Sequence, residues 1–254
     1  VEAGAGSGTW SRVETCEGRP LGVRGAVAAT RPRRVVIRGA RRAGKSSNVA
    51  GTAVADATSG SWAIAAGTVG LFNIFSARKD QAADRIATCV EIAEAIGLKS
   101  GEDYRATTQH VTFPKFRTEI RVTVANEASA VSGTSIGGLA DEVAHWGREE
   151  GANPAAKILS QFQWSMSTNR HAILWIVSAP ILTTDPHAIE FDRCRANTLR
   201  ATIPSYVGNP TLNREEMRAE AEDEIDFLRN VEAIPCDVMG LPLATEAAPE
   251  DGAK

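Results

Sequence analysis

The stretch that decides the fold is residues 35–46, VVIRGARRAGKS, in which a short apolar run leads into a glycine-containing turn that ends in lysine and serine. Gly39 and Gly44 have the spacing of a phosphate-binding loop that follows a buried strand and precedes a helix. Glycine tolerates backbone angles that turn successive N–H groups inward, and the positive end of the helix favours an anion there. The stretch predicts a loop that holds the phosphates of a nucleotide; the alternative is an ordinary turn.

The side chains of this loop have distinct expected roles. Lys45 is expected to reach the β- and γ-phosphates and to act in catalysis, and the Ser46 hydroxyl is expected to ligate Mg²⁺. A guanidinium at the γ-phosphate can raise the rate of phosphoryl transfer by about 10³ to 10⁵, which makes Arg41 a catalytic candidate; alternatively, a loop arginine faces solvent or pairs with a carboxylate. The residues expected to contact the nucleotide are Gly39, Ala40, Arg41, Arg42, Ala43, Gly44, Lys45, Ser46 and Ser47.

An acidic pair follows a second apolar run, in residues 136–142, IGGLADE. Asp141 is expected to hold the water shell of the metal opposite Ser46, and Glu142 to polarise the water that attacks the γ-phosphate. The alternative is a solvated strand end. Next to this pair, His145 and Trp146 either transmit the nucleotide state or pack against the following helix.

A third apolar run ends in a hydroxyl and a proline, in residues 175–180, WIVSAP. Proline ends a strand's hydrogen-bond ladder, so Ser178 is expected at a strand end beside Ala179 and Pro180. A hydroxyl beside the γ-phosphate can sense whether that phosphate is present. The alternative is a strand that leaves the sheet through a turn.

The hydrophobic periodicity predicts an α/β fold with a mostly parallel sheet and helices on both faces. Strands are expected at residues 35–38, 71–77, 109–113, 116–124, 136–140 and 172–177, and helices at residues 45–57, 80–96, 154–166, 187–199 and 213–230. The expected organisation is an N-terminal arm at 1–32, a nucleotide-binding core at 33–210, a helical lid or linker at 211–241 and a disordered tail at 242–254.

The net charge of −3 conceals an uneven distribution. Residues 1–48 hold ten basic and three acidic residues, whereas residues 213–254 hold four basic and twelve acidic residues. The basic end suggests contact with nucleic acid or an acidic subunit, or else a solvated arm. The apolar segment 62–75 is too short and broken to span a membrane. The four cysteines lack metal-ligand or redox spacing and are expected to be reduced thiols; they are Cys16, Cys89, Cys194 and Cys236.

Over residues 33–235 the chain resembles the ATPase domain of the large terminase subunit of tailed bacteriophages. The resemblance rests on the loop at 39–46, the segment SARKDQA at 76–82, the acidic pair at 141–142 and Ser-Ala-Pro at 178–180. It implies a RecA-like P-loop NTPase of the additional-strand (ASCE) class, which binds ATP and Mg²⁺ and moves double-stranded DNA into a procapsid. It also implies a pentameric homo-oligomeric ring, a portal protein and a small terminase subunit as partners, and the cytoplasm of the infected bacterial host as location.

The resemblance further implies that Arg41 contacts the γ-phosphate and that Ser178, Ala179 and Pro180 couple hydrolysis to movement. Family members often carry an arginine near 131–133 that reaches a neighbouring subunit, but this chain has VSG there. Arg117, Arg121 and Arg148 are therefore the candidates for an intersubunit arginine. The family's nuclease domain is expected to be absent from this chain, and the acidic run at 215–226 is expected to be a solvated face or lid contact.

Two rival functions remain open at this point. The acidic pair and Ser-Ala-Pro also resemble the motor core of superfamily 2 helicases, which would make the chain a helicase-like DNA-dependent ATPase. The other rival is a nucleotide-gated assembly module that binds ATP to hold a ring together without motor activity.

Overall fold

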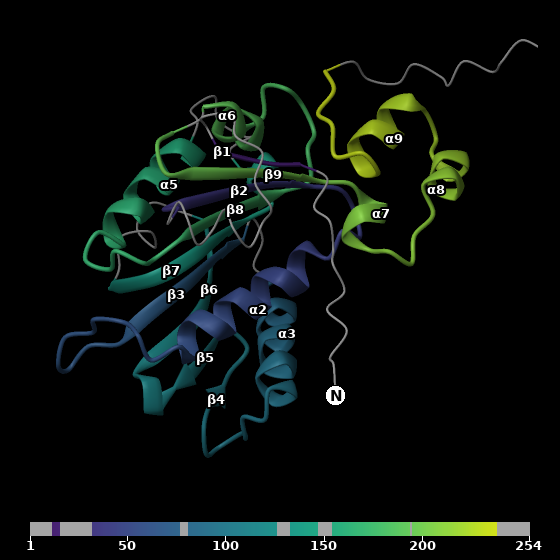
Figure 1. Ribbon diagram of the computed structural model, residues 1–254. Coiled ribbons are helices and arrows are strands. Elements are labelled where there is room, and N and C mark those ends of the chain that lie inside the picture. Colours follow the sequence, from purple (N-terminus) through teal and green to yellow (C-terminus); the bar gives the residue numbers. More distant parts are fainter. Residues whose placement is uncertain are drawn as a thin grey trace, which may run out of the picture.

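The computed structural model describes residues 12–15, 32–76, 81–125, 133–146, 154–193 and 195–237, the first of these as backbone only (Figure 1). The described strands form one sheet in the order β1-β9-β2-β8-β7-β3-β6-β5-β4. They are β1 (Arg12–Thr15), β2 (Arg34–Gly39), β3 (Gly70–Ser76), β4 (Arg105–Ala106), β5 (His110–Phe113), β6 (Thr118–Val124), β7 (Thr134–Asp141), β8 (Leu174–Ser178) and β9 (Thr198–Ile203).

The sheet is mixed rather than purely parallel. The strands from β9 through β2, β8, β7 and β3 to β6 run parallel, whereas β1 pairs with β9, β5 with β6 and β4 with β5 in antiparallel fashion. The parallel centre was predicted, and strands were predicted near β5 and β6. Parallel strands end at the same edge of a sheet, which is what gathers the candidate site.

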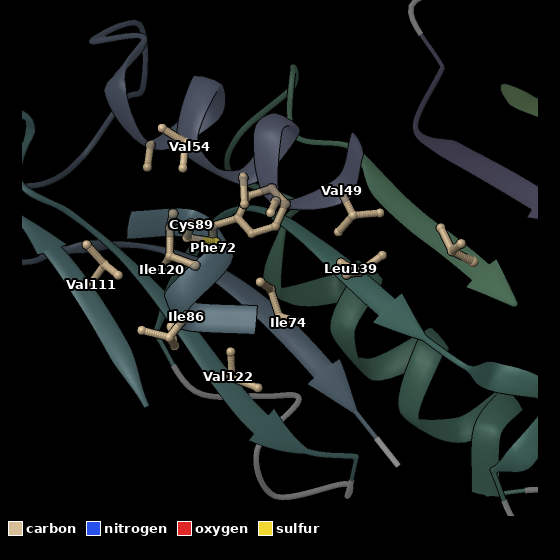
Figure 2. Packing of buried hydrophobic residues seen from close by; sticks show 14 of the residues in the cluster. Val49, Val54, Phe72, Ile74, Ile86, Cys89, Val111, Ile120, Val122 and Leu139 are labelled. Atoms are coloured by element: carbon tan, nitrogen blue, oxygen red, sulfur yellow. The ribbon is translucent and has the colours of Figure 1, made fainter. Parts of the chain in front are cut away.

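Helices cover both faces of the sheet, as predicted. The helical segments are α2 (Lys45–Thr58), α3 (Gln81–Ala95), η1 (Pro114–Phe116), η2 (Val143–His145), α5 (Pro154–Ser165), α6 (Pro186–Asp192), α7 (Ser205–Gly208), α8 (Arg214–Glu220) and α9 (Glu224–Asn230). Successive side chains of β2 point to opposite faces of the sheet and belong to two separate cores. Val35 and Ile37 pack beside α2 and α3, whereas Val36 packs beside α5. Figure 2 shows the first core, in which Val54 of α2 and Ile86 of α3 lie over the sheet.

Two predicted helices are wrong in part. The helix expected at 187–199 ends with α6 at Asp192, and Thr198 and Leu199 belong to β9. The helix expected at 213–230 is divided into α8 and α9, because Asp223 starts a new helix by accepting a hydrogen bond from the N–H of Asp226 at 2.7 Å. Within 1–32, where a loosely packed arm was expected, β1 pairs with β9 at the edge of the sheet.

Other expectations concern the cysteines and the membrane. Cys89 is buried and free, and burial raises the pKa of its thiol to about 12. Cys236 is also free, while Cys16 and Cys194 lie outside the residues whose side chains are described, as do the tail at 242–254 and residues 77–80 of the SARKDQA segment. Among the helices of the described ranges, none is long and apolar enough to cross a membrane.

Candidate active site

The loop between β2 and α2, which carries the predicted phosphate-binding residues, passes twice through the left-handed region. Arg42 has a φ of 58°, and Gly44, immediately before α2, has a φ of 72°. Glycine takes this conformation without a steric penalty, whereas a side-chain-bearing residue takes it less readily. The loop thereby turns the chain from the end of β2 into the N-terminus of α2, where the first N–H groups of the helix have no intrahelical partner.

The stem of Lys45 folds back over Gly39. A Cβ atom at residue 39 would lie 2.6 Å from Cδ of Lys45, so a larger residue there would displace the lysine from this position. The ammonium donates hydrogen bonds to the carbonyls of Gly39 at 2.9 Å and Ala40 at 2.6 Å. Burial lowers the pKa of Lys45, and the nearby carboxylates of Glu142 and Asp141 oppose that shift. The lysine therefore lies within electrostatic reach of the acidic pair.

Three neighbouring parallel strands bring the predicted motifs to one edge of the sheet. In the register of β2 with β8, Arg38 lies beside Ser178, and in that of β7 with β8, Asp141 lies beside Val177. The loop that starts after Gly39, the acidic pair and the Ser-Ala-Pro turn therefore all begin at the same carboxyl edge. This is the edge at which open α/β sheets commonly bind ligands.

The carboxylate of Asp141 is buried and paired with Arg85 of α3. The distances from Oδ2 are 2.6 Å to Nη2 and 2.8 Å to Nε of the guanidinium. The side chains of Asp141 and Arg85 are 5% and 16% exposed, so the pair is largely shielded from water. Arg85 was not predicted to lie at the site, because the only sequence signal in its helix is the apolar stripe.

Glu142 lies at a sharp change of chain direction. Its backbone is left-handed, with φ 57° and ψ 39°, and it precedes the short helix η2. A non-glycine residue in this region stores strain, a feature that is common at functional sites. The Glu142 side chain is 28% exposed, and its Oε2 lies 3.3 Å from Nε2 of His145. The site thus holds one buried carboxylate and one that is partly open to solvent.

Hydrogen bonds fix η2 to the ends of β8 and β7. The buried hydroxyl of Ser178 accepts the N–H of Ala144 at 3.1 Å and donates to the carbonyl of Ala179 at 3.0 Å. The indole of Trp146 donates to the carbonyl of Asp141 at 3.0 Å and packs in the core beside α5. The turn that carries Glu142 is therefore tied to both strand ends.

The remaining predicted loop residues differ in exposure. Arg41, Arg42 and Ser47 are exposed, while Ala43 is buried. Arg41 is close enough to lower the pKa of Lys45, so of the two loop arginines it is the one that acts on the lysine electrostatically. The side chain of Ser46 lies outside the described part of the chain.

The end of β9 and the segment after it support the loop through contacts that were not predicted. The N–H of Ala40 donates to the carbonyl of Ile203 at 2.9 Å, and the N–H of Arg41 donates to the carbonyl of Asn230 at 3.0 Å. The hydroxyl of Ser205 donates to the carbonyl of Arg41 at 2.6 Å. Two of these contacts join backbone groups. They do not depend on the types of residue involved, so the sequence gives no signal for them.

Two of the three candidates for an intersubunit arginine belong to the described part of the chain. Arg117, which lies between η1 and β6, donates to the carbonyl of Ile64 at 2.8 Å. Arg121 pairs with Glu119 of the same strand at 2.8 Å. Arg148 lies outside the described residues, and the intersubunit role of all three stays a prediction.

The residues at this edge fit a magnesium ion that is shared with a nucleotide. In the described ranges, no group of three or more His, Cys, Asp or Glu side chains could hold a metal by itself. Asp141 offers one buried carboxylate at the end of a strand. Mg²⁺ is typically bound by one or two carboxylates together with waters and substrate phosphates, which is the donor set available here.

Comparison with protein families and with curated proteins finds no match to this sequence. Solved structures do match it. The large terminase of a thermophilic bacteriophage has a TM-score of 0.58 at 16% identity, covering 81% of this chain and 49% of that one. The ATPase domain of the Thermus phage P74-26 large terminase matches with a TM-score of 0.59 at 16% sequence identity. The match covers 86% of this chain and 95% of that domain. The HK97 bacteriophage large terminase matches with a TM-score of 0.59 at 16% sequence identity. The match covers 82% of this chain and 48% of that one.

These structures define the fold class. This chain spans about half the length of the thermophilic phage protein and nearly all of the P74-26 ATPase domain. The thermophilic phage protein has also been solved in complex with ADP. The architecture of this chain is accordingly that of the ATPase domain of bacteriophage large terminases.

Proposed function

We propose that this chain is a P-loop ATPase motor domain that couples the hydrolysis of Mg-ATP to the translocation of double-stranded DNA into a viral procapsid. The observation that carries the proposal is the convergence of the β2–α2 loop, the Asp141-Glu142 pair and Ser178 at one edge of the sheet. The ADP complex of a similarly folded terminase supports a nucleotide as the ligand.

The loop would bind the phosphates of ATP. Lys45 has its ammonium on two loop carbonyls, and these bonds must be exchanged for the β- and γ-phosphates when the nucleotide binds. Arg41 is exposed and close to Lys45, so its guanidinium can approach the γ-phosphate. Charge on the γ-oxygens rises during phosphoryl transfer, and these two cations would stabilise it.

The acidic pair would divide the remaining tasks. Asp141 and Ser46 would hold Mg²⁺, which neutralises part of the charge on the phosphate oxygens when it is bound. Glu142 would act on the attacking water, because its carboxylate is at the same edge but is more open to solvent than that of Asp141. A carboxylate next to the water orients it and accepts its proton.

Ser178, Ala179 and Pro180 would couple the nucleotide state to movement. The support is the hydrogen bond from the N–H of Ala144 to Ser178, which joins the end of β8 to the turn that follows Glu142. A shift of the acidic turn on hydrolysis would therefore displace the end of β8 through this hydrogen bond. The same proposal includes assembly of this chain as a pentameric ring. It also includes docking on a portal protein and a small terminase subunit, in the cytoplasm of an infected bacterium.

Replacement of Glu142 tests the catalytic assignment. We expect Glu142→Gln to bind ATP as the wild type does and to lose turnover by about 10² to 10⁴, because glutamine cannot accept the proton of the attacking water. ATP binding is measured with a fluorescent analogue and turnover by phosphate release. Glu102→Gln is the matched control, since Glu102 forms an exposed pair with Lys99 and should retain full turnover. Undiminished turnover in Glu142→Gln would remove the catalytic role.

The motor function is tested by the ATPase rate with and without double-stranded DNA over a range of protein concentrations. We expect weak activity for dilute protein, and a rise with both DNA and concentration, because subunit contacts would complete each site. DNA contacts to phosphates should weaken steeply as salt rises. Strand unwinding by this chain alone would favour the helicase-like rival, and phosphate release in a single turnover without DNA stimulation would favour the assembly module.

A further inference from the structure

Arg85 occupies the carboxylate that the proposed function assigns to magnesium. Its guanidinium makes two contacts, both to Oδ2 of Asp141, and both side chains are largely shielded from water. Arg85 belongs to α3, which lies outside the loop and the strand-end motifs and packs against α2. The ion pair therefore links a helix that carries none of the predicted site residues to the predicted metal ligand.

The charges at the site explain why this pair forms. Lys45 interacts electrostatically with two carboxylates, Glu142 and Asp141, and with two further cations, Arg41 and Arg85. A carboxylate as buried as that of Asp141 is unfavourable without a counter-ion. The ammonium of Lys45 is hydrogen-bonded to loop carbonyls rather than to Asp141, so the direct partner is Arg85.

Mg²⁺ and Arg85 can each act as the counter-ion of the Asp141 carboxylate. Each neutralises Asp141, so a metal ion that ligates Asp141 competes with the guanidinium for the negative charge of this carboxylate. The order of events then follows from charge. A divalent ion that is held together with the phosphates would bring a stronger counter-charge than one guanidinium, and Arg85 would be released from Asp141 into solvent.

We propose that Arg85 is a positioning residue that serves as the counter-ion of Asp141 in the nucleotide-free protein and is exchanged for the divalent metal when the metal–nucleotide complex binds. The inference rests on the proposed function, because it assumes that Asp141 serves the metal of a nucleotide site. Its consequence is that the ion pair sets the metal concentration at which the site fills, and that metal binding breaks this ion pair between α3 and β7.

The test measures metal binding directly rather than turnover. Mn²⁺ replaces Mg²⁺ as the probe, and its binding to the full chain in the presence of ADP is followed by the loss of the free-ion electron paramagnetic resonance signal. We expect Arg85→Gln to bind Mn²⁺ about tenfold more tightly than the wild type, because the competing cation is gone. Arg85→Lys should show a smaller rise, since it keeps the charge but loses the two-point contact.

The control is Arg193→Gln. Arg193 is a half-exposed arginine whose partner Glu190 keeps Arg34 and Arg195, so its loss should leave the Mn²⁺ affinity unchanged. Thermal unfolding without nucleotide gives a second readout. Arg85→Gln should be less stable than the wild type, and adding Asp141→Asn to it should restore stability, because no unpaired carboxylate remains.

Each result decides between the possibilities. An unchanged Mn²⁺ affinity in Arg85→Gln overturns the exchange, and if that variant does not fold, an unchanged affinity in Arg85→Lys overturns it equally. Weaker ADP binding at every metal concentration also overturns it, because Arg85 would then contact the phosphates in place of competing with the metal. If the wild type binds no ADP at any Mn²⁺ concentration, the proposed function itself fails.

Discussion

Asp56, near the end of α2, is a half-buried residue whose carboxyl group links stability to pH through its protonation. Burial raises its pKa from 3.8 to about 7. Between those values the folded protein holds a proton that the unfolded chain has released. This contribution to stability is complete at low pH and is lost as pH rises through about 7.

We expect Asp56→Asn to remove this dependence, since asparagine carries no titrating group. Relative to the wild type, the variant should be little changed at about pH 4 and should be more stable by up to about 4 kcal/mol at about pH 8, because the pKa of Asp56 is raised from 3.8 to about 7. Urea unfolding at several pH values measures the difference. A difference that is constant over that range would contradict the assignment.

Because His187 also makes stability depend on pH, the stability of Asp56→Asn must be compared with that of the wild type at each pH. It is fully buried, its Nε2 lies 3.0 Å from the carbonyl of Ile37, and burial lowers its pKa to about 4. A histidine with a lowered pKa contributes stability above its ordinary pKa near 6.5 that is lost as pH falls toward 4. This effect opposes that of Asp56, and it cancels in the difference between the two proteins.

The packing of β7 against α5 depends on a position without a side chain. A Cβ atom at Gly138 would lie 2.3 Å from the ring of Phe162 and 2.9 Å from the carbonyl of Asn73. The two glycines of β7 weaken its strand propensity in the sequence, and the structure shows that one of them is required by this close approach.

We expect Gly138→Ala to destabilise the protein by about 2 kcal/mol, because the methyl group overpacks the boundary between β7 and α5. Gly51→Ala is the matched control in α2, where an added Cβ meets nothing within 4 Å. That control should be more stable than the wild type by about 0.5 to 1 kcal/mol, the difference in helix propensity. Equal effects of the two substitutions in urea unfolding would show that β7 and α5 can separate freely.

At the scale of the whole molecule, the C-terminal part of the described chain meets the loop between β2 and α2. α7 packs against this loop so closely that a Cβ atom at Gly208 would lie 2.5 Å from the carbonyl of Ala43. Together with the hydrogen bonds of Ile203, Ser205 and Asn230, this contact makes the C-terminal segment part of the support of the loop.

We expect Gly208→Ala to weaken ADP binding by about tenfold, because displacing the loop by even a small amount misaligns its N–H groups. Titration with a fluorescent ADP analogue measures this, with Gly51→Ala again as the control. Wild-type affinity in Gly208→Ala would mean that the loop is supported from β2 and α2 alone.

Much of the architecture was accessible from the sequence because its signals are local. The apolar run of β2, the glycine spacing after it and the alternation in β6 each lie within about ten residues, and backbone geometry converts them directly into strand, turn and helix. The ends of β7 and β8 lie at one edge because the two strands are parallel, and a mostly parallel sheet was predicted. The segment at 198–203 was assigned in part to a helix because its pattern is too short for periodicity to separate the two classes.

What the sequence alone determined, then, is the α/β class and the sequence motifs that follow the apolar runs of β2, β7 and β8. The tertiary structure decided that Arg85 neutralises Asp141, that β9 extends the sheet beside β2, and that Ser205 and Asn230 hold the loop. The physical reason is distance along the chain. These contacts join residues far apart in sequence through ion pairing and backbone hydrogen bonds, whose partners are set only when the elements pack.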